Sequence, residues 1–275
     1  MEVYSWGSGS YGRLGNGSNA DQTKPQRVGS VLCGCRPTQV ACGWYHSAVC
    51  TASGEVIMFG SNVTGCLGIQ DEAEEEAARP EIDAKQQPRT GGHAPKVFSP
   101  QVIRSFPQKL LVKSVSCGGD LLGAHTLAVT SSGRLFAWGY GPACGVGVTS
   151  TVDAPTMLTK FLAQTDTNDA PTIIRRRGFK SVQRNKISKS LCLNPRILVA
   201  SAGSSFSVAL STDGEVFCWG LAANGRLGHR SQVRIQLRPR RVEAISDRVE
   251  DVAAGGANCV AVCNGRLMGW GDNAK

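Results

Sequence analysis

The sequence predicts an all-β fold, and more specifically a β-propeller built of stacked antiparallel sheets. One six-residue phrase recurs five times: a charged residue, an aliphatic residue, a bulky apolar residue, a mostly small residue, an aromatic residue and glycine. Its copies are residues 2–7, 55–60, 134–139, 215–220 and 266–271. The aromatic residues are Trp6, Phe59, Trp138, Trp219 and Trp270, which stand 53, 79, 81 and 51 positions apart. A unit of roughly fifty residues with several short strands is typical of propeller blades.

A second repeated stretch precedes four of the five phrases, at residues 40–49, 115–129, 201–210 and 252–262. Each is joined to its phrase by a Ser-Gly, Asp-Gly or Asn-Gly pair, at residues 53–54, 132–133, 213–214 and 264–265. These pairs supply the positive φ that a short hairpin loop needs. We therefore expect a β-hairpin in each unit.

The phrase is apolar on both faces of the strand that it predicts. Val216 and Cys218 alternate with Phe217 and Trp219, so neither face suits water. A strand with two apolar faces must be covered on both, which stacked sheets achieve and a one-sided sheet does not.

Another turn and another strand are expected after each aromatic-glycine pair. The turns are assigned to the Gly-x-Leu-Gly-like segments 12–15, 65–68, 144–147 and 225–228. A proline then introduces each strand, at Pro25, Pro100, Pro155 and Pro239. Proline suits the first residue of an outer strand because it cannot donate to the sheet.

We expect one repeat domain, 1–275, because 41% hydrophobic content suffices for a substantial core in a chain of this length. Two insertions interrupt it: an acidic one at about 69–98 and a basic one at about 160–196. The simplest interpretation is that both are solvated surface insertions, since long loops cost little closure entropy.

Neither a membrane span nor a secretory leader is evident in the sequence, because Met1 leads directly into a repeat strand. We therefore expect an intracellular protein, nuclear or cytoplasmic, with no membrane partner. The eleven cysteines fall mostly in small-residue slots of the repeat and lack zinc spacing, so we expect buried, reduced thiols and no metal site.

The repeats resemble those of the regulator of chromosome condensation family. The resemblance rests on Val-x-x-Gly followed by His-Ser or His-Thr, the Gly turn, the Trp-Gly strand and Gly-x-Leu-Gly, and it covers nearly the whole chain except the insertions. It implies a seven-bladed propeller, of which this chain holds about four to five repeats. The chain is then either a piece of a longer propeller or a truncated one whose uncovered end sheets need a partner.

The resemblance implies a protein-protein interaction platform, with a small GTPase as one conceivable partner. An alternative is a cofactor-free guanine-nucleotide exchange factor for a Ran-like GTPase. The family's exchange factor carries an acidic residue just before the motif histidine, whereas the matching positions here are Tyr45, Ala124, Ser205 and Ala257. Asp120 lies nearby, in an enlarged turn.

Basic residues provide a candidate docking surface for an acidic protein or a phosphate backbone. They are Arg175, Arg176, Arg177, Lys180, Arg184, Lys186, Arg238, Arg240 and Arg241. A second alternative is therefore a propeller associated with chromatin or nucleic acid. A net charge of +9 fits this interpretation, but no aromatic stacking platform accompanies the basic residues.

No arrangement of nucleophile, base and orienting acid is recognisable, so we predict no catalytic residue, no cofactor and no metal. His46 and His125 occupy a repeat slot that holds Phe206 and Asn258 in other copies. A slot shared with phenylalanine indicates packing or hydrogen bonding within the blade rather than catalysis.

Overall fold

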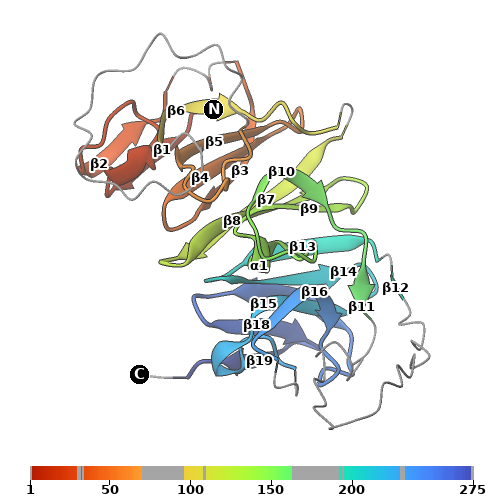
Figure 1. The fold of residues 1–275 in the computed structure, drawn as a ribbon. Helices are drawn as coiled ribbons and strands as arrows, with labels where there is room; N and C mark the ends of the chain where they lie inside the picture. The colour runs from red at the N-terminus through yellow and green to blue at the C-terminus, as the bar shows by residue number, and fades with distance from the viewer. Residues whose placement is uncertain are drawn as a thin grey trace, which may run out of the picture.

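The described part of the chain consists of five sheets stacked one after another, antiparallel except for one parallel strand pair (Figure 1). The computed structural model describes residues 2–29, 32, 34–69, 96–107, 110–162, 192–193, 195–229 and 233–273. The all-β fold predicted from the sequence is confirmed. Most of both predicted insertions, residues 70–95 and 163–191, lies outside the described residues.

We number the sheets as blades 1 to 5 in chain order. Blade 1 contains β1 (Tyr4–Gly7) and β2 (Gln22–Arg27). Blade 2 contains β3 (Pro37–Cys42), β4 (His46–Thr51), β5 (Val56–Ser61) and β6 (Lys96–Val102). Blade 3 contains β7 (Val112–Asp120), β8 (Gly123–Thr130), β9 (Leu135–Gly139) and β10 (Val152–Met157).

Blade 4 contains β13 (Ile197–Ala202), β14 (Phe206–Ser211), β15 (Val216–Leu221) and β16 (Ile235–Arg241), extended by the short strands β11 (Phe161–Leu162) and β12 (Cys192–Leu193). Blade 5 contains β17 (Val249–Ala254), β18 (Asn258–Cys263) and β19 (Arg266–Gly271). Three single turns of helix follow the aromatic-glycine pairs: η1 (Ser10–Gly12), α1 (Gly141–Cys144) and η4 (Ala223–Gly225).

The stretch before each phrase forms two strands, not the single strand that we expected. In blade 2 it divides after Cys42, where β3 ends, and β4 begins at His46. The amide of Gly43 donates a 2.8 Å hydrogen bond to the carbonyl of His46, which closes this tight turn. A complete blade therefore has four strands, and the repeated phrase supplies the third.

The prolines lie inside the outer strands and do not begin them. Pro100 is the fifth residue of β6, and the pairing of β6 with β5 shifts register between Met58 and Gly60. The ladder is irregular at this point, so a residue without an N–H group is tolerated there. Strand pairing starts earlier than the proline signal suggested.

Neighbouring blades bury both faces of each shared sheet, as the two apolar faces of the phrase predicted. In blade 4, Val216 and Cys218 belong to a core cluster with Val252 and Cys259 of blade 5. Phe217, on the other face, belongs to a cluster with residues of blade 3. The hydrophobic core is thus a series of layers between blades.

Strand registers define two rims of the stack. The turn between β3 and β4 lies at the same end of blade 2 as the junction of β5 and β6, because His46 pairs with Gly60 and Ser61 with Lys96. We call this end the turn rim. The acidic insertion leaves and returns there, whereas the chain leaves β10 at the opposite rim, beside Leu135, before the basic insertion.

Candidate interaction surface

The aromatic residue of each complete blade fits against a turn of the blade before it. The indole Nε1 of Trp219 donates a 2.7 Å hydrogen bond to the carbonyl oxygen of Ala143, and a Cβ on Gly145 would meet this indole at 2.7 Å. Trp138 lies against Gly68 in the same way. Trp138 and Trp219 are fully buried, which places them in the packing between blades.

Two further aromatic positions follow the same geometry. Phe59 is buried against Gly15, and the indole Nε1 of Trp270 donates to the carbonyl of Arg226 at 3.1 Å. Trp6 differs, because 61% of its surface is exposed. The described chain contains no turn of a preceding blade for Trp6 to enter, so the covering that the sequence predicts for both faces of the phrase does not extend to Trp6.

The turn in blade 3 is also placed differently from our expectation. The packing partner of Trp219 is Gly145, which corresponds to Gly68 and Gly228, so the turn spans residues 142–145 and not 144–147. Pro142 occupies the position of the first glycine and lies in the first turn of α1. A proline is well suited to that helical position, since its fixed φ is already helical.

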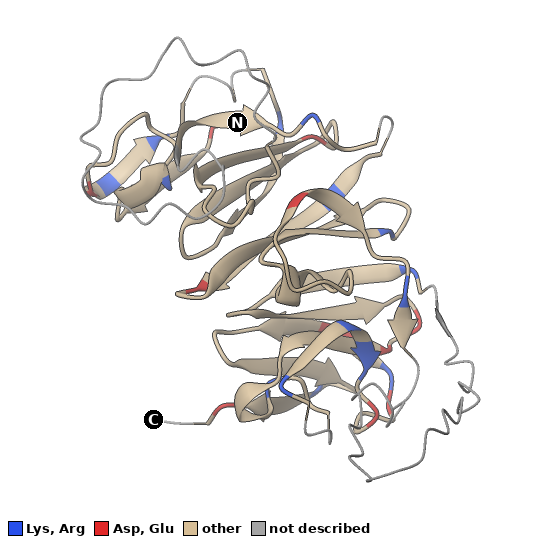
Figure 2. Ribbon diagram, viewed as in Figure 1, with Lys and Arg blue, Asp and Glu red and all other residues tan. Residues whose placement is uncertain are grey.

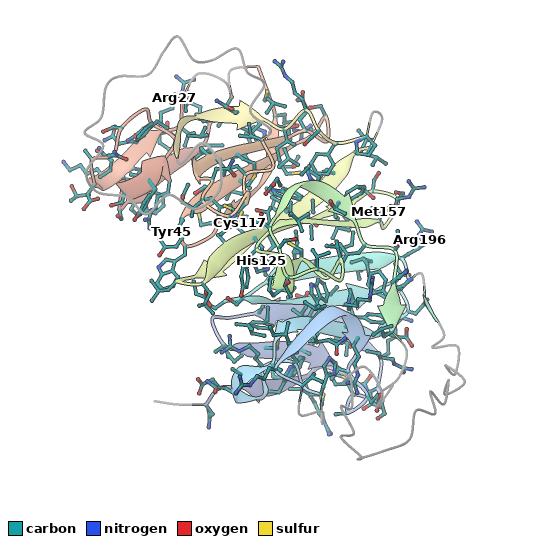
Figure 3. All side chains as sticks on the ribbon, in the orientation of Figure 1. Arg27, Tyr45, Cys117, His125, Met157 and Arg196 are labelled. Atoms are coloured by element: carbon teal, nitrogen blue, oxygen red, sulfur yellow. The ribbon has the colours of Figure 1, made fainter. Side chains whose placement is uncertain are left out.

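The repeat histidines connect one blade to the next. His46 Nε2 lies 2.8 Å from Thr126 Oγ1, and His125 Nε2 lies 2.9 Å from Ser207 Oγ. Both hydroxyls donate to carbonyl oxygens, of Cys66 and Ala143 respectively, so each hydroxyl accepts from the imidazole N–H. Burial lowers the pKa of both histidines to about 3, which keeps them neutral. His125 lies in the interior (Figure 3), where an interblade link is the role that its contacts support.

The predicted basic surface is only partly described, and one of its members is buried. Arg240 is 6% exposed because β11 pairs with β16 there, with Leu162 opposite Arg240. Arg240 is therefore not a docking residue, contrary to our expectation. Arg241 forms a 3.3 Å ion pair with Glu215, and Arg238 is half-buried, with its guanidinium against Gly147.

The other six basic residues lie outside the described residues: Arg175, Arg176, Arg177, Lys180, Arg184 and Lys186. Their part in docking stays a prediction. The three described arginines do not by themselves form an open basic patch.

The hairpin of β7 and β8 is the most prominent feature of the turn rim. Its tip exposes two leucines, Leu121 at 85% and Leu122 at 60% of their surface. The carboxylate of Asp120 accepts a hydrogen bond from the amide of Leu122 at 2.8 Å and another from Ser205 Oγ of blade 4 at 2.7 Å. The tip is thereby braced against the neighbouring blade.

An aromatic group on the same rim continues this apolar surface. The rings of Trp44 and Tyr45 stack with centroids 5.6 Å apart, and Tyr11 meets Tyr45 edge-on at 5.4 Å. The guanidinium of Arg13 lies 5.5 Å from the Tyr45 ring centroid. Figure 3 shows Tyr45 at the edge of the molecule. We call Trp44, Tyr45, Leu121 and Leu122 the Leu-Trp ridge.

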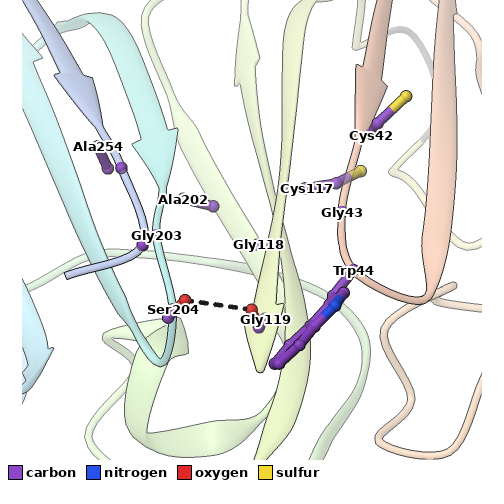
Figure 4. Close-up of a pocket in the computed structure, with 12 residues that line it drawn as sticks. Cys42, Gly43, Trp44, Cys117, Gly118, Gly119, Ala202, Gly203, Ser204 and Ala254 are labelled. Carbon is purple, nitrogen blue, oxygen red and sulfur yellow. Dashed lines mark hydrogen bonds between the residues drawn. The ribbon is translucent and has the colours of Figure 1, made fainter. Parts of the chain in front are cut away.

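A shallow hollow of about 330 Å³ adjoins the ridge where the inner strands of blades 2 to 5 converge. Figure 4 shows Trp44 reaching toward Gly119, with Ser204 Oγ donating to the Gly119 carbonyl at 3.4 Å. Its remaining walls are small residues: Cys42, Gly43, Cys117, Gly118, Ala202, Gly203, Ala254, Gly255 and Gly256. Glycine is required at position 118, since a Cβ there would lie 2.5 Å from the Gly203 carbonyl oxygen.

Sequence reasoning noticed the enlarged turn around Asp120 but missed the leucines beside it. The sequence does indicate a longer hairpin tip in blade 3, because more residues lie between Cys117 and its motif histidine than between Cys42 and His46 in blade 2. The link from Asp120 to Ser205 has no sequence signal, since 85 residues separate the two.

Within the described ranges, no three His, Cys, Asp or Glu side chains are grouped so that they could hold a metal ion. The described helices are all too short or too polar to cross a membrane.

Repeated four-stranded blades, stacked face to face and linked by aromatic residues and histidines, define a β-propeller repeat protein. The family model "Regulator of chromosome condensation (RCC1) repeat" matches residues 2–50, 53–129 and 213–262, and a second model of the same description matches 38–66 and 199–226. The chain belongs to the RCC1 repeat family.

Curated relatives align along almost the whole chain. The Ultraviolet-B receptor UVR8 of Arabidopsis thaliana is 28% identical over 99% of this chain and 49% of its own length. The E3 ubiquitin-protein ligase HERC2 of Homo sapiens is 30% identical over 99% of this chain and 5% of its own length. The Secretion-regulating guanine nucleotide exchange factor of Bos taurus is 30% identical over 86% and 42%, respectively. The chain therefore spans about half, or less, of these relatives.

Solved structures show the same fold. Human WBSCR16 superposes with a TM-score of 0.69 at 21% identity, covering 98% of this chain and 56% of that structure. Yeast RCC1 (Prp20), in a structure bound to Kap60, superposes with a TM-score of 0.69 at 19% identity, covering 99% and 52%. The described blades correspond to about half of a propeller of this family.

Proposed function

We propose that this chain is a protein-interaction platform that binds its partner through the Leu-Trp ridge. The observation that carries the proposal is the exposure of two adjacent leucines on a hairpin that Asp120 and Ser205 brace. An exposed apolar residue is ordinary when it stands alone, but a contiguous rigid group marks an interaction site. Large aromatic side chains beside it, such as Trp44, are enriched at the centres of interfaces.

The chemistry of the ridge favours a protein over a nucleic acid. Its side chains are largely apolar, and the charge beside its leucines is the carboxylate of Asp120, which repels phosphate, while the Arg13 guanidinium lies over the Tyr45 ring. One relative, the RCC1 domain-containing protein RUG3 of Arabidopsis thaliana, is 28% identical and is described as mitochondrial. A nuclear or cytoplasmic site of action for this chain stays a prediction.

The proposal is tested by comparing partner capture with a matched control. The double variant Leu121→Ser/Leu122→Ser removes the exposed apolar tip, whereas Leu111→Ser changes a leucine that is 53% exposed on the opposite rim. We expect proteins captured by the wild type, and then rebound in purified form, to be lost with the double variant and kept with Leu111→Ser. Capture that is indifferent to the tip would contradict the proposal.

Nucleotide exchange on a Ran-like GTPase is the second candidate. Ser205 occupies the position before the motif slot where the family's exchange factor is acidic, and the Asp120 carboxylate lies 2.7 Å from the Ser205 hydroxyl. The acid is thus supplied from the neighbouring blade. Release of fluorescent GDP by substoichiometric chain, abolished by Asp120→Ala, would support this candidate. Release at the spontaneous rate would exclude it for the GTPase tested.

A further inference from the structure

The Asp120 carboxylate is held firmly but is not neutralised by a cation. Its two oxygens accept one hydrogen bond each, from the Leu122 amide and the Ser205 hydroxyl. No salt bridge to Asp120 occurs within the described ranges of the chain. A carboxylate has about four acceptor sites, so roughly two remain for an incoming donor. Figure 2 shows red, the colour of acidic residues, at the tip of the β7–β8 hairpin.

Cations elsewhere on the turn rim are engaged within their own surroundings. The Arg13 guanidinium lies over the rings of Tyr11 and Tyr45, at 5.6 and 5.5 Å. Arg226 is 9% exposed and donates to the carbonyls of Ala223 and Ser204. Both therefore have other contacts, which leaves the carboxylate available to a partner.

The unpaired carboxylate adjoins an apolar surface with a small hollow beside it. Asp120 is next in sequence to Leu121, and Gly119 lines the same hollow as Trp44. At about 330 Å³ and open to solvent, the hollow is at the lower end of ligand-pocket sizes, which begin at roughly 300 Å³. It suits one large side chain better than a whole cofactor.

We infer that the ridge binds a protein segment that carries a lysine or arginine next to a large apolar side chain. The cation pairs with the Asp120 carboxylate while the apolar side chain enters the hollow beside Trp44 and contacts Leu121 and Leu122. Charge complementarity selects this occupant, because an acidic segment would meet an uncompensated negative charge. The inference rests on the proposed function and names the class of partner.

The test uses the intact chain of 275 residues as bait for a phage library of random twelve-residue peptides. We expect enriched peptides to combine basic and large apolar residues, and a synthetic consensus peptide to bind the wild type more weakly at high salt. Asp120→Asn removes the charge but keeps an oxygen for the Leu122 amide, and should weaken binding roughly 5-fold. The double variant Leu121→Ser/Leu122→Ser should weaken binding at least as much.

A second variant separates charge from bracing. Ser205→Ala removes the hydrogen bond to Asp120 but leaves the carboxylate charged, so the peptide's preference for a basic residue should persist. Thermal unfolding of each variant checks that the chain is folded. Leu121 and Leu122 are exposed, so their substitution should not change Tm appreciably.

Each outcome bears on one of the two claims. Peptides that depend on the leucines but lack basic residues, or bind Asp120→Asn equally well, overturn the partner class and leave the platform proposal standing. A library that yields no tip-dependent peptide also overturns the partner class, and the capture experiment above then decides the platform separately. Peptide binding and partner capture that are both indifferent to the leucines overturn both the partner class and the platform proposal.

Discussion

The indole of Trp219 is joined to the carbonyl oxygen of Ala143 by a 2.7 Å hydrogen bond that crosses from blade 4 to blade 3. The equivalent indole, Trp138, is as deeply buried, but its Nε1 has no hydrogen-bond partner within the described structure. Two side chains in one repeat slot thus differ in this hydrogen bond, which makes them a natural pair for experiment.

The first prediction uses that pair. Trp219→Phe removes a satisfied donor and leaves the Ala143 carbonyl with one bond fewer, whereas Trp138→Phe removes a donor that was unsatisfied. Both lose similar apolar volume, so we expect Trp219→Phe to lower the free energy of unfolding by about 1 kcal/mol more than Trp138→Phe. Urea denaturation of the two variants measures the difference. Equal losses would show that the hydrogen bond adds nothing.

The second prediction concerns the glycine against which the Trp138 indole packs. Gly68 has φ +65°, and a Cβ there would lie 2.9 Å from Trp138 Nε1. Gly17 has φ +81° but nothing within 4 Å, so Gly17→Ala reports the conformational cost alone, about 1–2 kcal/mol. Gly68→Ala should cost about 1–3 kcal/mol more, because it also overpacks the interblade layer. Similar denaturation midpoints for the two variants would contradict this packing argument.

The third prediction is a loss of stability in mild acid. Burial lowers the pKa of His46 and His125 to about 3 in the folded chain and that of His229 to about 4, against about 6.5 when unfolded. Below pH 6.5 the unfolded chain therefore binds more protons, and stability falls as pH decreases toward the folded values. Each buried histidine should contribute about 1.4 kcal/mol per pH unit in this window.

A variant isolates the contribution of one histidine. Phe206 occupies the slot of His125 in the next blade, so His125→Phe places a side chain that the repeat already accepts. The free energy of unfolding, followed from pH 7 to 5, should fall less steeply in the variant than in the wild type. Parallel curves would mean that His125 is not kept neutral by burial.

The fourth prediction concerns thiol reactivity. Cys42 is exposed, whereas burial raises the pKa of Cys50 to about 11 and that of Cys66 to about 12. The thiolate is the reactive form, so iodoacetamide at pH 8 should label Cys42 well before Cys50 and Cys66. Peptide mass spectrometry measures the order, and labelling in urea serves as the control. Early modification of Cys66 in the native chain would contradict the packing described for blade 2.

The repeat could be predicted from sequence because local chemistry repeats with it. Alternating apolar positions such as Val216 to Trp219 fix a strand with two covered faces, and Ser-Gly or Asn-Gly pairs fix its turns. The blade-3 turn could not be placed correctly, because Pro142 replaces the glycine that marks the other copies.

The interaction surface could not be predicted from the sequence, because it depends on contacts between residues that are far apart in the chain. Arg240 reads as an exposed basic residue, but pairing of the distant strand β11 covers it. Asp120 reads as a loop residue, yet Ser205 of another blade fixes its carboxylate. Both facts follow from how separate repeats meet in space, which a single sequence does not state.

The packing of each aromatic residue against a glycine of the preceding blade has a consequence for how such repeat arrays grow. Each of blades 1 to 4 carries the aromatic residue and, in the turn that follows it, the glycine against which the aromatic residue of the next blade packs. A tandem duplication of one whole blade copies the aromatic residue and the glycine together, so the added blade can pack against both of its neighbours. Lengthening the array therefore requires no change to existing contacts, whereas deletion of half a blade would leave one aromatic residue without the glycine that it packs against.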